Sequence, residues 1–226
     1  MDETVKAHGI ILALAILLVG CSREETTVTR DSVAETELTT DDRIGQFWKW
    51  FDTNKQRIEA DAKGMVPVIA TELERVHPDL RHELGIGQPM EMFVSAGGIR
   101  EMIPYVERTV ELAPSIEGWK VVAFLQPKQD SLTVAYEGFT LMRSQVKWTG
   151  SKDGDLLDVV FFIDGLDEQR RSAYVGATFV MLDSVLGEYA VMTKIGQVDF
   201  RPISDAPQDA KPIESLRDEI ASSSSS

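Results

Sequence analysis

The sequence predicts an α+β protein with a single folded domain, built from a mixed β-sheet of about six or seven strands that about four helices cover. Two patterns carry this prediction. Apolar residues recur at helical spacing in four segments, and short runs rich in β-branched and aromatic residues lie between them. The composition agrees, because 43% of the 226 residues are hydrophobic and 27% are charged, as in ordinary globular proteins.

Four segments carry the helical pattern. The first begins near Asp41 or Asp42, either of which can cap it. Proline and glycine mark two of the other boundaries, since Pro104 suits a first helical turn and Gly187 suits the position after a helix. The segments that carry these helices are 41–63, 64–80, 99–113 and 167–189, the last with its helix ending before Gly187.

The predicted strands alternate with turn residues. The segment over 149–155, which contains Asp153-Gly154, has the composition of a hairpin connection. The run LLDVVFFI after it is nearly all apolar, as in a central strand that is covered on both faces. We expect one parallel crossover over 90–125 and an antiparallel meander in the remainder. The predicted strands cover 90–96, 118–127, 132–138, 139–148, 156–163, 189–193 and 195–203.

The chain is expected to divide into four regions, which are a signal peptide over 1–20, a Thr-rich tether over 21–42, the α+β domain over 43–203 and an acidic, Ser-rich flexible tail over 204–226. The tether contains almost no large apolar side chain, so it cannot bury enough surface to offset its chain entropy. The tail ends in a run of serines, which is typical of a flexible end.

The only cysteine, Cys21, follows a run of ten apolar residues from Ile10 to Val19. That run is too short to cross a bilayer core, which takes about 20 residues, and has the length of a signal-peptide core. Residues 18–21, Leu-Val-Gly-Cys, resemble the lipobox of bacterial lipoproteins. The resemblance implies cleavage before Cys21, lipid attachment to it, and anchoring in the cell envelope. Ser22 resembles the outer-membrane sorting signal of Gram-negative envelopes. The alternative is a buried thiol at the end of a core helix.

The formal net charge of −14 excludes some partners. So acidic a surface repels phosphate backbones, and no cluster of Lys and Arg offsets it locally, so we expect no nucleic-acid binding. Membrane attachment should depend on the lipid anchor rather than on a basic patch.

Three sequence blocks over 47–54, 111–127 and 179–189 resemble an uncharacterised bacterial protein family. The resemblance spans most of residues 47–203 and supports one folded unit. It implies no activity and no site residue.

No candidate reactive group lies in the sequence motif that its chemistry usually requires. His77 and His82 are five residues apart rather than the four of a helical metal pair, and no serine lies in a G-x-S-x-G motif, the nearest being Ser95. The SAGGIR segment could bind an anion through backbone N–H groups, or could be only a tight turn. We therefore expect no catalytic residue, no metal and no cofactor.

The carboxylates around the fourth helix could serve a hydrolase if two of them converged, or could be helix caps and solvated residues. These are Asp164, Asp167, Glu168, Asp183 and Glu188.

Aromatic side chains offer a surface for contact with a ligand or partner. Trp48 and Trp50 lie about 200° apart on one helix, so one of them should be partly exposed. We take Trp48, Trp50 and Trp119 as the candidate contact residues, with edge tryptophans of a core as the alternative. The predicted function is that of a lipid-anchored envelope protein whose domain binds a protein or another envelope component, without catalysis. The alternative is an envelope hydrolase that uses carboxylates in a groove.

Overall fold

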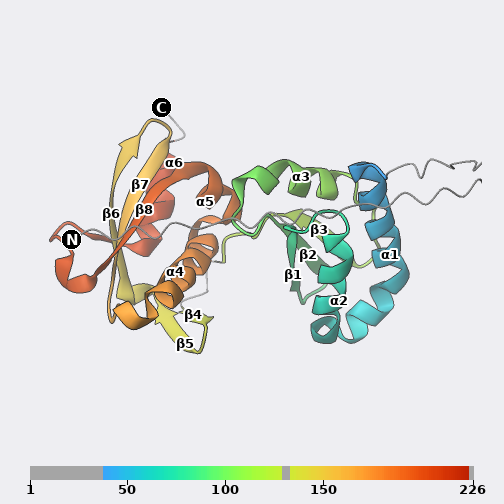
Figure 1. Ribbon diagram of the computed structural model, residues 1–226, viewed down its shortest axis with the longest axis horizontal. Coiled ribbons are helices and arrows are strands. Elements are labelled where there is room, and N and C mark those ends of the chain that lie inside the picture. The colour runs from blue at the N-terminus through green and yellow to red at the C-terminus, as the bar shows by residue number, and fades with distance from the viewer. Residues whose placement is uncertain (1–37, 129–132, 224–226) are drawn as a thin grey trace, which may run out of the picture. The chain divides into compact units, whose positions relative to one another are not determined.

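The computed structural model describes residues 38–128 and 133–223 (Figure 1). In these two ranges the chain forms six α-helices and nine strands, which confirms the predicted α+β class. The strands lie in three sheets rather than one. The signal peptide, Cys21 and residues up to 37 of the tether lie outside the described residues.

Helix α1 (Thr40–Ala60) begins earlier than the sequence predicted, because Thr39 and not an aspartate is its N-cap. The Thr39 hydroxyl accepts a hydrogen bond from the Asp42 N–H, and the Thr39 N–H donates to the Asp42 carboxylate, so Asp42 is the third residue of a capping box. Asp41 instead accepts a hydrogen bond from the Arg108 side chain at 2.9 Å. The predicted tether boundary at residue 42 is therefore wrong, because Thr39 and Thr40 already belong to the capped helix.

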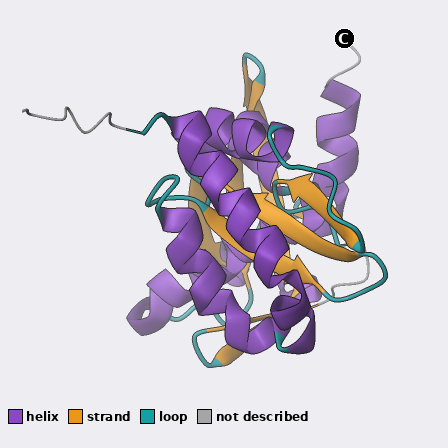
Figure 2. Ribbon diagram, turned by 90° about the vertical axis from the view of Figure 1, so that its right-hand side faces the viewer, coloured by secondary structure: helices purple, strands orange, loops and turns teal. Residues whose placement is uncertain are grey.

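The first sheet has the order β1-β2-β3 and is covered by helices (Figure 2). Strands β2 (Met90–Ser95) and β3 (Trp119–Ala123) are parallel neighbours. Helix α3 (Ile103–Glu111) lies in the connection between them, which confirms the predicted crossover. Strand β1 (Arg81–Gly85) was not predicted, because its sequence RHELG is polar and too short for a strand pattern. Helix α2 (Ala62–Glu74) and α1 contribute the largest buried side chains of this layer, among them Trp48, Phe51 and Ile69.

The second layer contains a short hairpin and a larger sheet. Strands β4 (Thr133–Tyr136) and β5 (Phe139–Met142) pair in antiparallel register. Strand β6 (Val146–Asp153) then turns at Gly154 into β7 (Leu156–Ile163), so the predicted hairpin is confirmed, although β6 extends through most of the segment predicted as its connection.

Strand β7 lies between β6 and β8 in the order β8-β7-β6-β9, as its nearly all-apolar sequence predicted. Strand β8 (Ile195–Pro202) runs parallel to β7, so the predicted antiparallel meander is wrong at this point. The connection between them is helix α4 (Arg171–Leu186), which ends at Gly187 as predicted, followed by α5 (Glu188–Lys194). The segment 189–193 was predicted as a strand, but it lies in α5, where the Val191 N–H donates to the Gly187 carbonyl and the Ile195 N–H to the Val191 carbonyl.

No single helix among the described residues has the length and apolarity to cross a membrane. The pair formed by Glu168–Leu186 and Glu188–Lys194 meets that test by length and composition alone, with a bend of 105° between its halves.

The predicted flexible tail is wrong for residues 204–223. Strand β9 (Lys211–Pro212) pairs with β6, and helix α6 (Leu216–Ser223) follows it. Ile213 and Leu216 are fully buried in the second hydrophobic cluster, together with α4 and β7 residues. These apolar side chains bind the segment to the core despite its acidic composition, so the domain does not end at residue 203.

Candidate binding pocket

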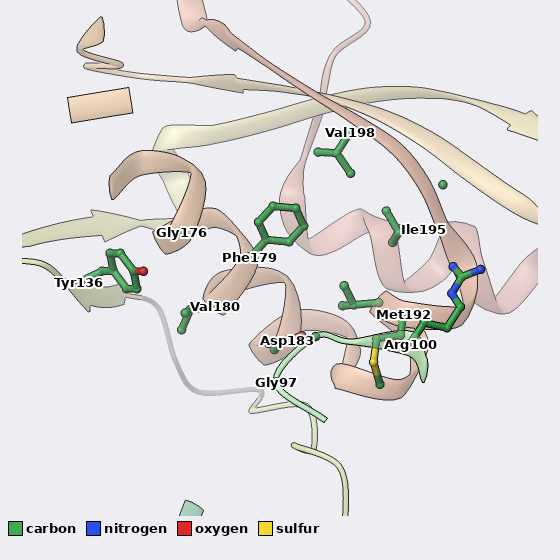
Figure 3. Close-up of a pocket in the computed structure, with 13 residues that line it drawn as sticks. Gly97, Arg100, Tyr136, Gly176, Phe179, Val180, Asp183, Met192, Ile195 and Val198 are labelled. Atoms are coloured by element: carbon green, nitrogen blue, oxygen red, sulfur yellow. The ribbon is translucent and has the colours of Figure 1, made fainter. Parts of the chain in front are cut away.

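A pocket of about 700 Å³ lies beside helices α4 and α5 (Figure 3). Its walls come from these two helices, from the start of β8, and from the turn that follows β2. Most of the lining side chains are apolar. They are Phe179, Val180, Val191, Met192, Ile195 and Val198. Phe179 and Val180 are 39% and 44% exposed, so the pocket presents apolar surface to solvent.

The sequence of α4 explains how this wall forms. The helix is apolar nearly all round, so one stripe packs in the core through Ala177, Met181 and Leu182 while another faces the pocket. Gly176 allows the ring of Tyr136 to pack directly on the helix backbone, since a Cβ atom at position 176 would lie 2.6 Å from that ring. Tyr136 thereby closes one side of the pocket.

A buried carboxylate fixes the opposite side. Glu188, only 1% exposed at the start of α5, accepts hydrogen bonds from the Ser95 hydroxyl at 2.8 Å, the Gly98 N–H at 3.3 Å and the Leu125 N–H at 3.0 Å. The Glu188 N–H donates in turn to the Leu125 carbonyl at 2.9 Å. The carboxylate therefore joins α5 to the segments that follow β2 and β3.

This arrangement decides between the two interpretations of SAGGIR. Gly97 and Gly98 adopt positive φ angles of 59° and 77°, as a tight turn requires. The Gly97 N–H donates to the Ser95 hydroxyl at 3.0 Å, and the Gly98 N–H donates to Glu188. The turn uses these donors within the protein, and the anion it holds is the protein's own carboxylate.

Asp183 is the acidic group of the pocket wall. It is partly buried on α4, and burial raises the pKa of its carboxyl to about 7, with smaller contributions in the same direction from Glu188 and Glu83 and an opposing one from Lys128. No hydrogen bond or ion pair to this carboxylate comes from the residues that the structure describes. Asp183 is therefore half protonated near neutral pH and has unused hydrogen-bonding capacity.

Arg100 is the basic group of the pocket, and its side chain is exposed. Figure 3 labels Arg100, which follows the Gly97-Gly98 turn, among the residues that line the pocket. It is not among the charges that shift the pKa of Asp183. The two charged groups of the pocket thus act separately.

The three tryptophans predicted as contact residues do not line this pocket. Trp48 is 1% exposed, and its indole N–H donates to the Thr109 carbonyl at 2.8 Å. Trp119 is 8% exposed and donates to Glu59 at 2.8 Å. Burial makes Trp48 and Trp119 core residues, so the contact prediction is wrong for them. Trp50 is partly exposed, as the helical geometry required, and packs against the hydrophobic cluster formed by α1, α2 and the first sheet.

The five carboxylates around α4 do not converge. Asp167 caps the turn before the helix, Glu168 pairs with Arg171, and Asp164 is exposed near the same end. Asp183 and Glu188 lie at the other end of a helix of 16 residues, which is about 24 Å long. Asp167 and Glu168 serve the cap and an ion pair, and although Glu188 is close enough to act on Asp183, its oxygens are already occupied by hydrogen bonds.

The two histidines and Ser95 make contacts within the fold. The Ser95 hydroxyl donates to Glu188 and accepts from the Gly97 N–H, as described above. The His77 ring lies 4.6 Å from that of Tyr105 and accepts a hydrogen bond from the Asp79 N–H. His82 is on strand β1 rather than at a helix end, and burial lowers the pKa of its imidazole. The described residues contain no group of three or more His, Cys, Asp or Glu side chains that could hold a metal ion.

The sequence signals the pocket only indirectly. Asp183 and Glu188 are among the carboxylates that it brings forward, but no pattern distinguishes Phe179 and Val180. An informative signal is the excess apolarity of α4, which exceeds what one core-facing stripe requires.

The chain matches no protein-family model, no curated protein and no solved structure. The resemblance of its three sequence blocks to an uncharacterised bacterial family, and that of residues 18–21 to a lipobox, stay predictions.

Replacing Glu188 with Gln should destabilise the fold by about 3 kcal/mol, because the new amide N–H₂ cannot accept the hydrogen bonds that the carboxylate accepts and leaves buried donors unpaired. Urea denaturation followed by circular dichroism measures the loss. Glu107→Gln, an exposed change on α3, is the control and should cost under about 0.5 kcal/mol. Equal effects of the two substitutions would contradict the structural role of Glu188.

Asp183→Asn should make the protein more stable at pH 8 but not at pH 4. The unfolded chain loses the Asp183 proton near the ordinary aspartate pKa of 3.8 and the folded chain near 7, so wild-type stability falls as the pH rises between these values. The variant should lack that component of the decline. Denaturation midpoints over pH 4–8 test this, with Asp209→Asn, an exposed change, as the control. A gain for Asp183→Asn that does not depend on pH would refute the titration of Asp183 as its cause.

Proposed function

We propose that this chain is a lipid-anchored protein of the bacterial cell envelope whose domain binds a ligand with a large apolar part. The observation that carries the binding proposal is the pocket beside α4 and α5, because its volume of about 700 Å³ lies within the range of small-molecule sites. A ligand that covers the exposed parts of Phe179 and Val180 would remove apolar surface from water, which favours binding. The ligand is a component of the envelope, and binding rather than catalysis is the proposed role.

The proposed anchor is Cys21. Lipid chains attached to this residue and to the new amino terminus would together hold the protein stably, since one acyl chain alone binds a bilayer only marginally. Ser22 supports the outer membrane as the destination if the cell is Gram-negative. The net charge of −14 favours a lipid anchor over electrostatic adsorption to an anionic membrane.

Cys21→Ser should release the protein from membranes that have been washed with high salt, because the serine hydroxyl cannot form the thioether. Expression in a bacterium with lipoprotein-processing enzymes, followed by membrane fractionation and intact mass measurement, tests this. Ser22→Ala is the control and should remain acylated. Recovery of wild-type protein that is unacylated and soluble would contradict the anchor.

Val180→Glu should weaken binding of the neutral fluorescent probe N-phenyl-1-naphthylamine at least about tenfold, because an ionised carboxylate would lose its hydration against the apolar probe. Val66→Glu is a matched control, since Val66 is also a helical valine with similar exposure, 42% against 44%, but does not line the pocket. Thermal denaturation checks that both variants fold. Equal probe binding by Val180→Glu and wild-type protein would refute the proposed site.

A further inference from the structure

We propose that the ligand carries a protonated amine on its apolar body and that its ammonium group pairs with Asp183. This inference rests on the function proposed above and specifies its ligand class. The pocket provides an apolar surface for the body of such a ligand and one partly buried carboxyl without a partner among the described residues. An ammonium group would supply hydrogen-bond donors and a positive charge to that carboxyl.

The charges that face Asp183 favour a cation. Glu188 on α5 and Glu83 on β1 both act on it as negative charges, whereas Lys128, after β3, is the opposing positive charge. Lys128 already pairs with Glu83 at 3.0 Å, so these two charges largely offset each other. The contribution of Glu188 then remains, and the potential at the Asp183 carboxyl is negative.

An acidic ligand is the competing possibility, and Arg100 is the group that would bind it. The Arg100 side chain is exposed to water, where an ion pair contributes little to affinity. A carboxylate inside the pocket would also face Asp183 and Glu188, and the protein as a whole has a net charge of −14. The surroundings therefore oppose an anion more than Arg100 favours one.

Amine binding should depend on pH in a direction that identifies its partner. An alkylammonium group keeps its proton throughout the neutral range, as a lysine does. Asp183 must be ionised to pair with it, and without ligand its pKa is about 7. Amine affinity should therefore rise between pH 6 and pH 8, and binding near pH 7 should release about half a proton per bound ligand to the buffer.

Three probes with the same eight-carbon chain distinguish the contribution of the head group to affinity from that of the apolar body. They are n-octylamine, 1-octanol and octanoate. Isothermal titration at pH 8 should give octylamine an affinity at least about tenfold above that of octanol, and octanoate the weakest of the three. Titration at pH 7 in two buffers of different ionisation enthalpy measures the proton release.

Asp183→Asn should keep octanol binding and bring octylamine to the affinity of octanol at every pH. Asp209→Asn, an exposed change outside the pocket, should leave the preference for the amine intact. If octanol binds and Asp183→Asn does not alter the ratio of amine to alcohol, this inference is overturned while the pocket proposal stands. If no probe binds, the pocket proposal itself fails, and this inference with it.

Discussion

The Glu188 carboxylate is the interaction on which the arrangement of this domain most depends. It is almost completely buried, and its two oxygens accept hydrogen bonds from three donors in two different segments of the first layer. Glu188 itself belongs to helix α5, which leads into strand β8 of the four-stranded sheet. A buried charge is tolerated only when hydrogen bonds replace its hydration, so this contact strongly restricts how the two layers can meet.

The pocket is a consequence of that restriction. The carboxylate fixes the start of α5 against the Gly97-Gly98 turn, and both elements line the cavity. Gly187, with a φ angle of 85°, then lets the chain turn from α4 into α5. Apolar side chains of both helices consequently face the space next to the turn. The walls are thus positioned by buried polar contacts, and most of the side chains on their inner surface are apolar.

The sequence predicts those parts of the fold that depend on local patterns. Helical spacing located α1 to α4, and the central position of β7 followed from its unbroken apolar run. Local patterns failed where distant residues decide the outcome. Glu188 bonds to residues 93 and 63 positions away, so nothing around it distinguishes it from a solvated glutamate. The acidic segment from residue 204 is ordered by Ile213 and Leu216, whose partners in the core are also distant in sequence.

Asp183 and Glu188 show why carboxylate type alone could not identify the site. They lie five residues apart at the same end of α4. Glu188 is 1% exposed, and Asp183 is partly buried. Three hydrogen-bond donors stabilise Glu188, and its role is thereby structural. Asp183 receives no such compensation from the described residues, and its ionised form is disfavoured. This partly buried carboxyl lines a pocket whose other side chains are mostly apolar. That difference in compensation, which the sequence does not contain, makes Asp183 the group that a bound cation would complete.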